Sequence, residues 1–186
     1  MRNISVKKLA FMGVMTAMAF IFGWLESLLP SFTGIPGVKA GFANIITMTV
    51  IFLPDEEAQS AEQRGTLITA IAISLIRVIL GGITYNGLSA MLYGLLGALF
   101  SLFIMYFLIR LRVFSVTAIS VAGGVCHNAA QLALACILLS DAVFYYLPFL
   151  IISGIISGAV IGIISSLVIK RLSGLFSHPQ GLQKDL

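Results

Sequence analysis

Charged residues are scarce in this chain. Only 10% of its 186 residues are Asp, Glu, Lys or Arg, whereas 59% are hydrophobic, and the mean hydropathy is +1.08. Such a composition cannot supply the polar surface that covers a soluble globular domain. The net charge of +4 is spread over segment ends and forms no basic stripe, which argues against a nucleic-acid partner. We therefore expect an all-α integral membrane protein.

Catalytic and metal-binding patterns are missing as well. The sequence contains no G-x-x-x-x-G-K-[ST] phosphate loop, which excludes ATP hydrolysis by that route. Only one of its two histidines lies in an apolar segment, too few for a three-ligand zinc site. Its two cysteines, Cys126 and Cys136, would lie about 15 Å apart on one helix and cannot form a disulfide with each other. We expect no cofactor and no metal ion.

Six apolar runs are candidates for membrane-spanning helices, which need about 20 residues. They extend over residues 9–29, 42–53, 66–83, 88–109, 114–139 and 146–169. The second run is short, so it could begin earlier, enter through residues 37–41 or cross obliquely. Short connections predict one compact six-helix transmembrane bundle at residues 1–172, followed by a polar cytoplasmic tail at residues 173–186. Because apolar sequence continues beyond Ala19, we expect the first run to be retained and not cleaved as a signal peptide.

Lysine and arginine residues set the expected orientation, because short cytoplasmic loops are enriched in them. With a cytoplasmic N-terminus, the inside collects Arg2, Lys7, Lys8, Arg64, Arg110, Arg112, Lys170, Arg171 and Lys184. The outside collects only Lys39, and Arg77 lies within a span. We expect both termini to be cytoplasmic in a multi-pass protein of the plasma membrane.

A small set of polar residues forms the candidate binding site, because charged and amide side chains inside a bilayer need partners or a ligand. The set is Glu26, Lys39, Asn44, Arg77, Tyr85, Asn86, His127, Asn128, Gln131, Tyr145 and Tyr146. Threading the six runs places all of them in the outer half of the membrane. Two interpretations stay open for Arg77: it forms an ion pair with Glu26, or it holds an anionic group of a ligand, as Lys39 could too. The tyrosines offer flat faces for a ring.

Two interpretations also stay open for the fifth run. His127, Asn128 and Gln131 fall within an arc of about 100° on a helix, with Gly123 and Gly124 on the same side. The glycines either leave room for a ligand or let two helices pack closely while the polar residues form hydrogen bonds across the bundle.

Small residues recur in two runs. Gly154, Gly158 and Gly162 occupy every fourth position of the last run, which favours close packing within the bundle. Gly13 and Ala17 form a weaker ridge in the first run, which we interpret as a surface for a partner subunit.

Four segments together resemble the Gx transporter family, formerly labelled heptaprenyl diphosphate synthase component I. They are GVKAGFAN at 37–44, RVILGG at 77–82, VAGGVCHNAAQ at 121–131 and YYLP at 145–148. The resemblance covers residues 8–170 approximately, and the combination of segments is specific although each is weak alone.

That family is similar in size and layout to the substrate-binding S components of energy-coupling factor (ECF) vitamin transporters. The resemblance implies six helices, cytoplasmic termini, a pocket near the outer face, and a transmembrane coupling subunit and two cytoplasmic ATPases as partners. S components often present Ala-x-x-x-Ala on the first helix, whereas this chain has Gly13 and Ala17 there. We therefore expect a transport subunit without an ATPase site that binds a small anionic ring-containing vitamin or cofactor precursor from outside.

Two alternatives belong to other functional classes. The older family label implies a membrane accessory subunit of isoprenoid or quinone biosynthesis. Prenyl transfer needs clustered aspartates that hold magnesium around a diphosphate, and this chain has only the separated Asp55, Asp141 and Asp185. A structural membrane scaffold is the third possibility, for which the outer half would be filled by its own side chains.

Overall fold

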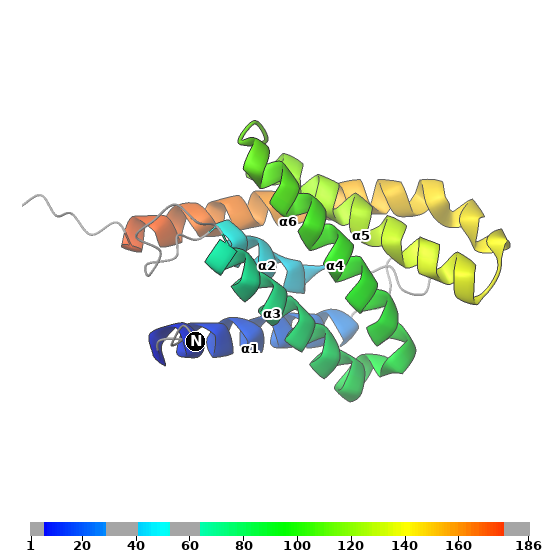
Figure 1. Cartoon of the computed structure of the whole chain (residues 1–186), viewed down its shortest axis with the longest axis horizontal. Helices are drawn as coiled ribbons and strands as arrows, with labels where there is room; N and C mark the ends of the chain where they lie inside the picture. The colour runs from blue at the N-terminus through cyan, green and yellow to red at the C-terminus, as the bar shows by residue number, and fades with distance from the viewer. Residues whose placement is uncertain (1–5, 29–40, 53–63, 177–186) are drawn as a thin grey trace, which may run out of the picture.

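The computed structural model describes residues 6–28, 41–52 and 64–176 (Figure 1). These residues are helical almost throughout and include no strand, which confirms the all-α prediction for the described part of the chain. The elements are α1 (Val6–Leu28), α2 (Phe42–Phe52), α3 (Arg64–Gly81), the π-helical turn η1 (Gly82–Asn86), α4 (Gly87–Leu111), α5 (Val116–Leu138), the 3-10 turn η2 (Asp141–Tyr146) and α6 (Leu147–Phe176).

The short helix α2 lies at the centre of the molecule. It packs against α1, α3 and α6, and eight of its eleven residues are buried. Met48 and Val50 are almost completely enclosed, together with Ile73 of α3. The sequence prediction of a short second helix is therefore confirmed, and α2 begins at Phe42 directly after Gly41, whose φ of +81° suits glycine.

Helices α3 and α4 form a hairpin without a loop. The chain passes from α3 through η1 into α4 in one continuous helical stretch and reverses its direction there (Figure 1). A π-helical turn and the positive φ of Gly87, +82°, supply the change of direction. The turn brings Tyr85 and Asn86 to the same end of the bundle as the last turn of α1.

Helices α5 and α6 pack backbone against backbone. A methyl group placed on Gly158 would lie 2.7 Å from Cα of Val121, and one on Gly162 would lie 2.7 Å from Cα of Thr117. Small residues at this interface let the two backbones touch, as they do in many membrane helix pairs. The interpretation of the Gly154, Gly158 and Gly162 ridge as a packing surface within the bundle is confirmed.

Four stretches of the described chain are long and apolar enough to cross a membrane, by length and hydropathy. They are 8–28, 67–111, 116–138 and 141–172. The sequence predicted six spanning segments, and this number differs from the four stretches in the described chain for two reasons. Helix α2 has only 11 residues, and α3, η1 and α4 are joined into one helical stretch of 45 residues. The described part of the chain thus has four candidate membrane-spanning stretches, as expected of a membrane protein.

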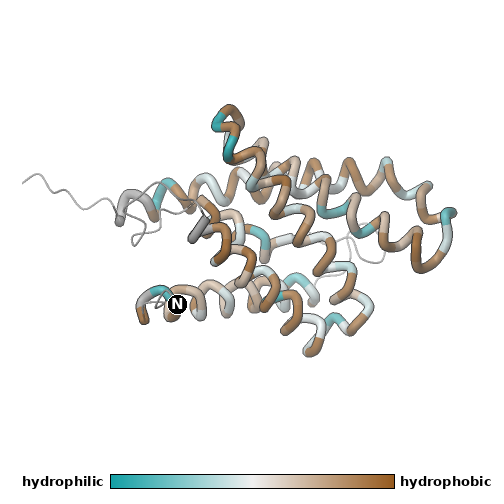
Figure 2. Tube along the Cα trace, in the orientation of Figure 1, coloured by the Kyte–Doolittle hydropathy of each residue, from teal (hydrophilic) through white to brown (hydrophobic). Residues whose placement is uncertain are grey.

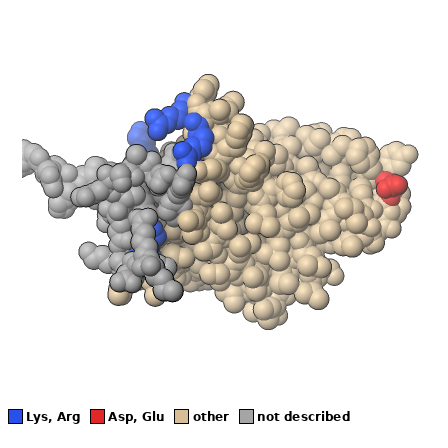
Figure 3. Space-filling view, viewed as in Figure 1, with Lys and Arg blue, Asp and Glu red and all other residues tan. Residues whose placement is uncertain are grey.

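The exterior of the described helices is apolar, whereas the charges lie at the ends. Large side chains such as Ile68, Phe103 and Leu167 are more than half exposed, and hydrophobic residues recur along every helix (Figure 2). Lysine and arginine side chains gather at one end of the space-filling view, and the acidic side chain lies at the opposite end (Figure 3). This distribution is typical of a protein whose flanks face lipid.

Candidate functional site

A cavity of about 650 Å³ opens among the helices, away from the basic end of the bundle. The last turns of α1, the first half of α2 and the C-terminal half of α3 form one wall. Residues along much of α4 and α5 and the N-terminal half of α6 form the other. A cavity of this size suits a small molecule, since ligand sites commonly measure about 300 to 1,000 Å³.

The α2–α3 wall carries the buried guanidinium. Nη2 of Arg77 donates a hydrogen bond of 3.0 Å to Oδ1 of Asn44. The Glu26 carboxylate accepts a hydrogen bond from the backbone N–H of Gly41 and interacts electrostatically with Arg77. Glu26 therefore links the end of α1 to the start of α2 and offsets part of the arginine charge, and both interpretations of Arg77 stay predictions.

Two buried polar atoms on this wall lack a hydrogen-bond partner among the residues that the structure describes. They are Nε of Arg77 and Oγ1 of Thr47, and the Thr47 side chain is only 3% exposed. Buried polar atoms are nearly always paired in folded proteins, so two such atoms at one cavity are unusual.

Tyr85 closes the α1 side of the cavity in a socket made by two glycines. Its hydroxyl lies 2.6 Å from the position of a Cβ on Gly23 and 3.0 Å from that of one on Gly81. Its ring packs on Phe20 with 5.5 Å between ring centroids. A side chain at either glycine would displace the tyrosine, which explains why these positions have none.

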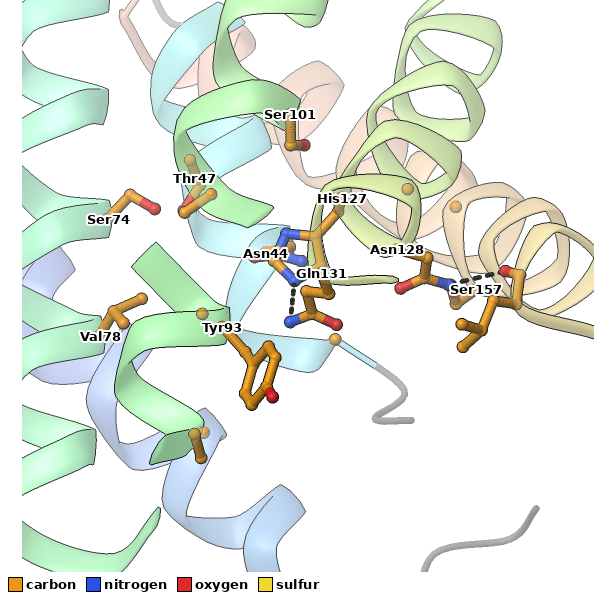
Figure 4. A pocket seen from close by; sticks show the side chains of 18 of the residues that line it. Asn44, Thr47, Ser74, Val78, Tyr93, Ser101, His127, Asn128, Gln131 and Ser157 are labelled. Carbon is orange, nitrogen blue, oxygen red and sulfur yellow. Dashed lines mark hydrogen bonds between the residues drawn. The ribbon is translucent and has the colours of Figure 1, made fainter. Parts of the chain in front are cut away.

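The α5 wall carries an imidazole held from two sides. Nε2 of His127 lies 3.1 Å from Nε2 of Gln131, one turn later (Figure 4), and another side of the ring faces Gly97 of α4. A Cβ on Gly97 would lie 2.8 Å from the ring. The close approach of α4 therefore positions His127 between two helices.

Asn128 and the glycines of α5 serve packing. Nδ2 of Asn128 donates a hydrogen bond of 2.8 Å to the carbonyl oxygen of Leu150 in α6. The space beside Gly124 is taken by the backbone of Gly154, and that beside Gly123 by the Met105 side chain. These contacts favour the packing interpretation of the two glycines, and Gly124 also lines the cavity.

Nine of the eleven predicted site residues line the cavity: Glu26, Asn44, Arg77, Tyr85, Asn86, His127, Asn128, Gln131 and Tyr146. Tyr145 does not, since its side chain is 88% exposed on the outside of η2, where consecutive residues of a tight turn point in different directions. Lys39 lies outside the described residues. Ligand binding by the nine stays a prediction.

The site set predicted from the sequence left out several polar residues of the cavity wall. They are Thr47, Ser74, Tyr93, Ser101, Ser120 and Ser157. Serine and threonine are common in membrane helices, where their hydroxyls can bond to the preceding turn, so hydropathy gives no signal for them. The spacing of the residues does give a signal for two of them. Thr47 follows Asn44 by three residues and Ser74 precedes Arg77 by three residues, so each pair lies on one face of its helix.

The predicted docking residues Gly13 and Ala17 lie on an exposed face of α1 that also includes Val14 and Met18. No atom lies within 4 Å of a Cβ placed on Gly13. The face is open in the described part of the chain, and its partner stays a prediction.

Comparison with known proteins identifies the family. A model of the family heptaprenyl diphosphate synthase component I matches residues 15–168, which is most of the chain and includes every cavity-lining residue. The chain therefore belongs to this family. No curated protein and no solved structure matches it.

Proposed function

We propose that this member of the heptaprenyl diphosphate synthase component I family is a membrane-embedded solute-binding protein that corresponds to the S component of an ECF-type transporter. Its solute is a small anionic molecule with a ring, of the vitamin or cofactor-precursor class, taken up from the extracellular side. The observation that supports the proposal is the cavity of about 650 Å³, which is lined by the guanidinium of Arg77 on one wall and the imidazole of His127 on the other. Fixed donors in a dry site favour an acceptor-rich ligand.

The proposed topology has six passes through the plasma membrane and both termini in the cytoplasm. The basic end, with the exposed Arg110, Arg112, Lys170 and Arg171, is then cytoplasmic, and the cavity lies in the outer half. In this arrangement α3 and α4 each cross once, and α2 is the oblique, incomplete pass.

The proposed partners are a transmembrane coupling subunit and two cytoplasmic ATPases. The coupling subunit docks on the face of α1 around Gly13 and Ala17, where small residues permit close approach. These partners supply the ATP hydrolysis for which the chain itself has no phosphate loop.

The family description favours a second function, an accessory subunit in isoprenoid or quinone synthesis. In that role the cavity would bind the polar head of a prenyl precursor. Co-purification of a prenyl synthase with this protein would support the accessory role, whereas co-purification of a coupling subunit would support transport.

Binding of an anionic solute predicts a specific loss in Arg77→Gln. Small molecules retained by the purified wild-type protein are identified by mass spectrometry, and their affinity is then measured for each variant. Arg77→Gln should weaken binding by about 2 to 5 kcal/mol if the anion is fully desolvated at the guanidinium. Arg110→Gln is the matched control, because Arg110 is exposed at the opposite end of the bundle. Equal affinities of the three proteins would refute the proposed role of Arg77.

The double variant Glu26→Gln with Arg77→Gln separates ligand contact from ion pairing. If Arg77 only neutralises Glu26, each single variant loses folding or binding and the double variant regains it. If Arg77 contacts the solute, the double variant remains as weak as Arg77→Gln.

A further inference from the structure

Thr47 has a buried hydroxyl with no partner, although the helix offers it one. Thr49 lies two residues later on α2, is equally buried, and donates a hydrogen bond of 2.8 Å to the carbonyl oxygen of Ile45 one turn earlier. Thr47 makes no such bond with the described residues, and its side chain lines the cavity. A threonine in a helix normally satisfies its hydroxyl on the preceding turn, so its failure to do so implies another acceptor.

The second unpartnered atom, Nε of Arg77, lies on the neighbouring helix. Helices α2 and α3 pack together, and Asn44, one turn before Thr47, already accepts a hydrogen bond from Nη2 of Arg77. That bond orients the guanidinium, while Nε keeps a hydrogen to donate. In Figure 4 the Ser74 side chain of α3 points toward Thr47 of α2. The residues Thr47, Ser74 and Arg77 therefore come from two packed helices that line the same wall of the cavity.

Such a donor set matches one ligand chemistry. Hydroxyls and an arginine Nε–H can all donate, and the nearby amide oxygen of Asn44 is already engaged by Arg77. An oxygen atom with negative charge accepts several such bonds, and bonds to a charged acceptor are the strong ones. Apolar neighbours on the same wall, Met48 and Val78, keep water scarce around it.

We propose that Thr47 and Arg77 form the oxyanion-binding subsite of the cavity, with Ser74 as its third donor. The subsite binds a carboxylate or phosphate group of the solute, and the remainder of the solute extends toward His127 and Tyr93. This inference rests on the proposed solute-binding function and names the groups that select the solute. The hydroxyl of Thr47 is kept unpaired in the empty protein because the ligand supplies its acceptor.

The test compares Thr47→Val with Thr49→Val, a matched pair on the same helix. Each substitution replaces a hydroxyl by a methyl group of similar size at a buried position. Wild type and both variants are freed of small molecules by prolonged dialysis in detergent, and Tm is measured. Each protein is then incubated with the low-molecular-weight filtrate of rich growth medium, and the retained compounds are quantified by mass spectrometry.

The expected results have opposite signs in the two assays. Thr47→Val should raise Tm of the empty protein by about 2 to 4 °C, because it removes an unpaired hydroxyl, and should reduce solute retention roughly ten- to hundredfold. Thr49→Val should retain the solute like wild type and should not gain stability, because it loses a bond that is made. The retained compound should carry a carboxylate or a phosphate.

Each other outcome overturns a distinct statement. Full retention by Thr47→Val, or a retained compound without carboxylate or phosphate, refutes the subsite and leaves solute binding in place. An unchanged or lowered Tm for the empty Thr47→Val protein refutes the unpaired state of the hydroxyl. Failure of wild type to retain any compound contradicts the proposed function itself, and the subsite with it.

Discussion

At the scale of single residues, Gly97 decides where the imidazole of His127 lies. The ring occupies the space that a side chain on Gly97 would need, and this contact directs Nε2 toward Gln131. Helix α4 thus controls a group of the cavity wall that belongs to α5.

Gly97→Ala is therefore expected to displace the ring and to weaken solute binding about tenfold, which corresponds to the loss of roughly one hydrogen bond. Isothermal titration of the purified variant with the retained compound measures the change. Gly13→Ala serves as the control, since no atom lies within 4 Å of its added methyl group. Wild-type affinity in Gly97→Ala would mean that the position of His127 does not matter for binding.

At the scale of elements, the contact between α5 and α6 holds the outer wall of the cavity. Packing of backbone against backbone gains dispersion energy that lipid tails cannot match, because the atoms are close and fixed. The bond from Asn128 to the carbonyl oxygen of Leu150 adds a directional link between the same helices.

Gly158→Leu should separate these helices, because the added side chain meets the backbone of Val121, which cannot rotate away. We expect a loss of about 3 kcal/mol or more in the free energy of unfolding, measured by thermal or denaturant unfolding in detergent. Gly13→Leu, on the open face of α1, should change the stability little. A Gly158→Leu protein as stable as wild type would show that the two helices can repack.

At the scale of the whole molecule, charge and cavity lie at opposite ends. Arg110, Arg112, Lys170 and Arg171 are exposed cations of the described residues at the basic end, whereas Asp141 lies in η2 at the other end. Such an asymmetry fixes the orientation of a multi-pass protein during insertion.

Cysteine labelling tests the proposed orientation, in which the basic end is cytoplasmic and the cavity lies in the outer half of the membrane. In a background with Cys126→Ala and Cys136→Ala, a membrane-impermeant maleimide applied to intact cells should modify Asp141→Cys and spare Arg112→Cys. Both positions are exposed in the structure, so access depends on the side of the membrane and not on burial. Opening the cells should make both positions reactive. The reverse pattern would place the cavity at the cytoplasmic face.

The sequence by itself determined the class of the protein, the shortness of its second helix and most of the cavity's polar wall. These features depend on local composition: the run at 42–53 has only 12 residues and is short wherever it lies, and a charged side chain inside an apolar run needs a partner or a ligand. The glycine ridge of α6 could also be predicted from the sequence, because residues spaced by four positions lie on one face of a helix.

The tertiary structure alone decided which polar atoms are paired. Thr47 and Thr49 lie two residues apart in the same apolar run, yet the Thr49 hydroxyl is bonded to Ile45 and the Thr47 hydroxyl has no hydrogen-bond partner among the described residues. The contacts of Gly124 and the exposure of Tyr145 could not be predicted, because they depend on distant segments and on the rotation of a turn. Hydropathy averages over a helix, whereas hydrogen bonding and close packing depend on the rotation of each helix about its own axis, which only the neighbouring helices fix.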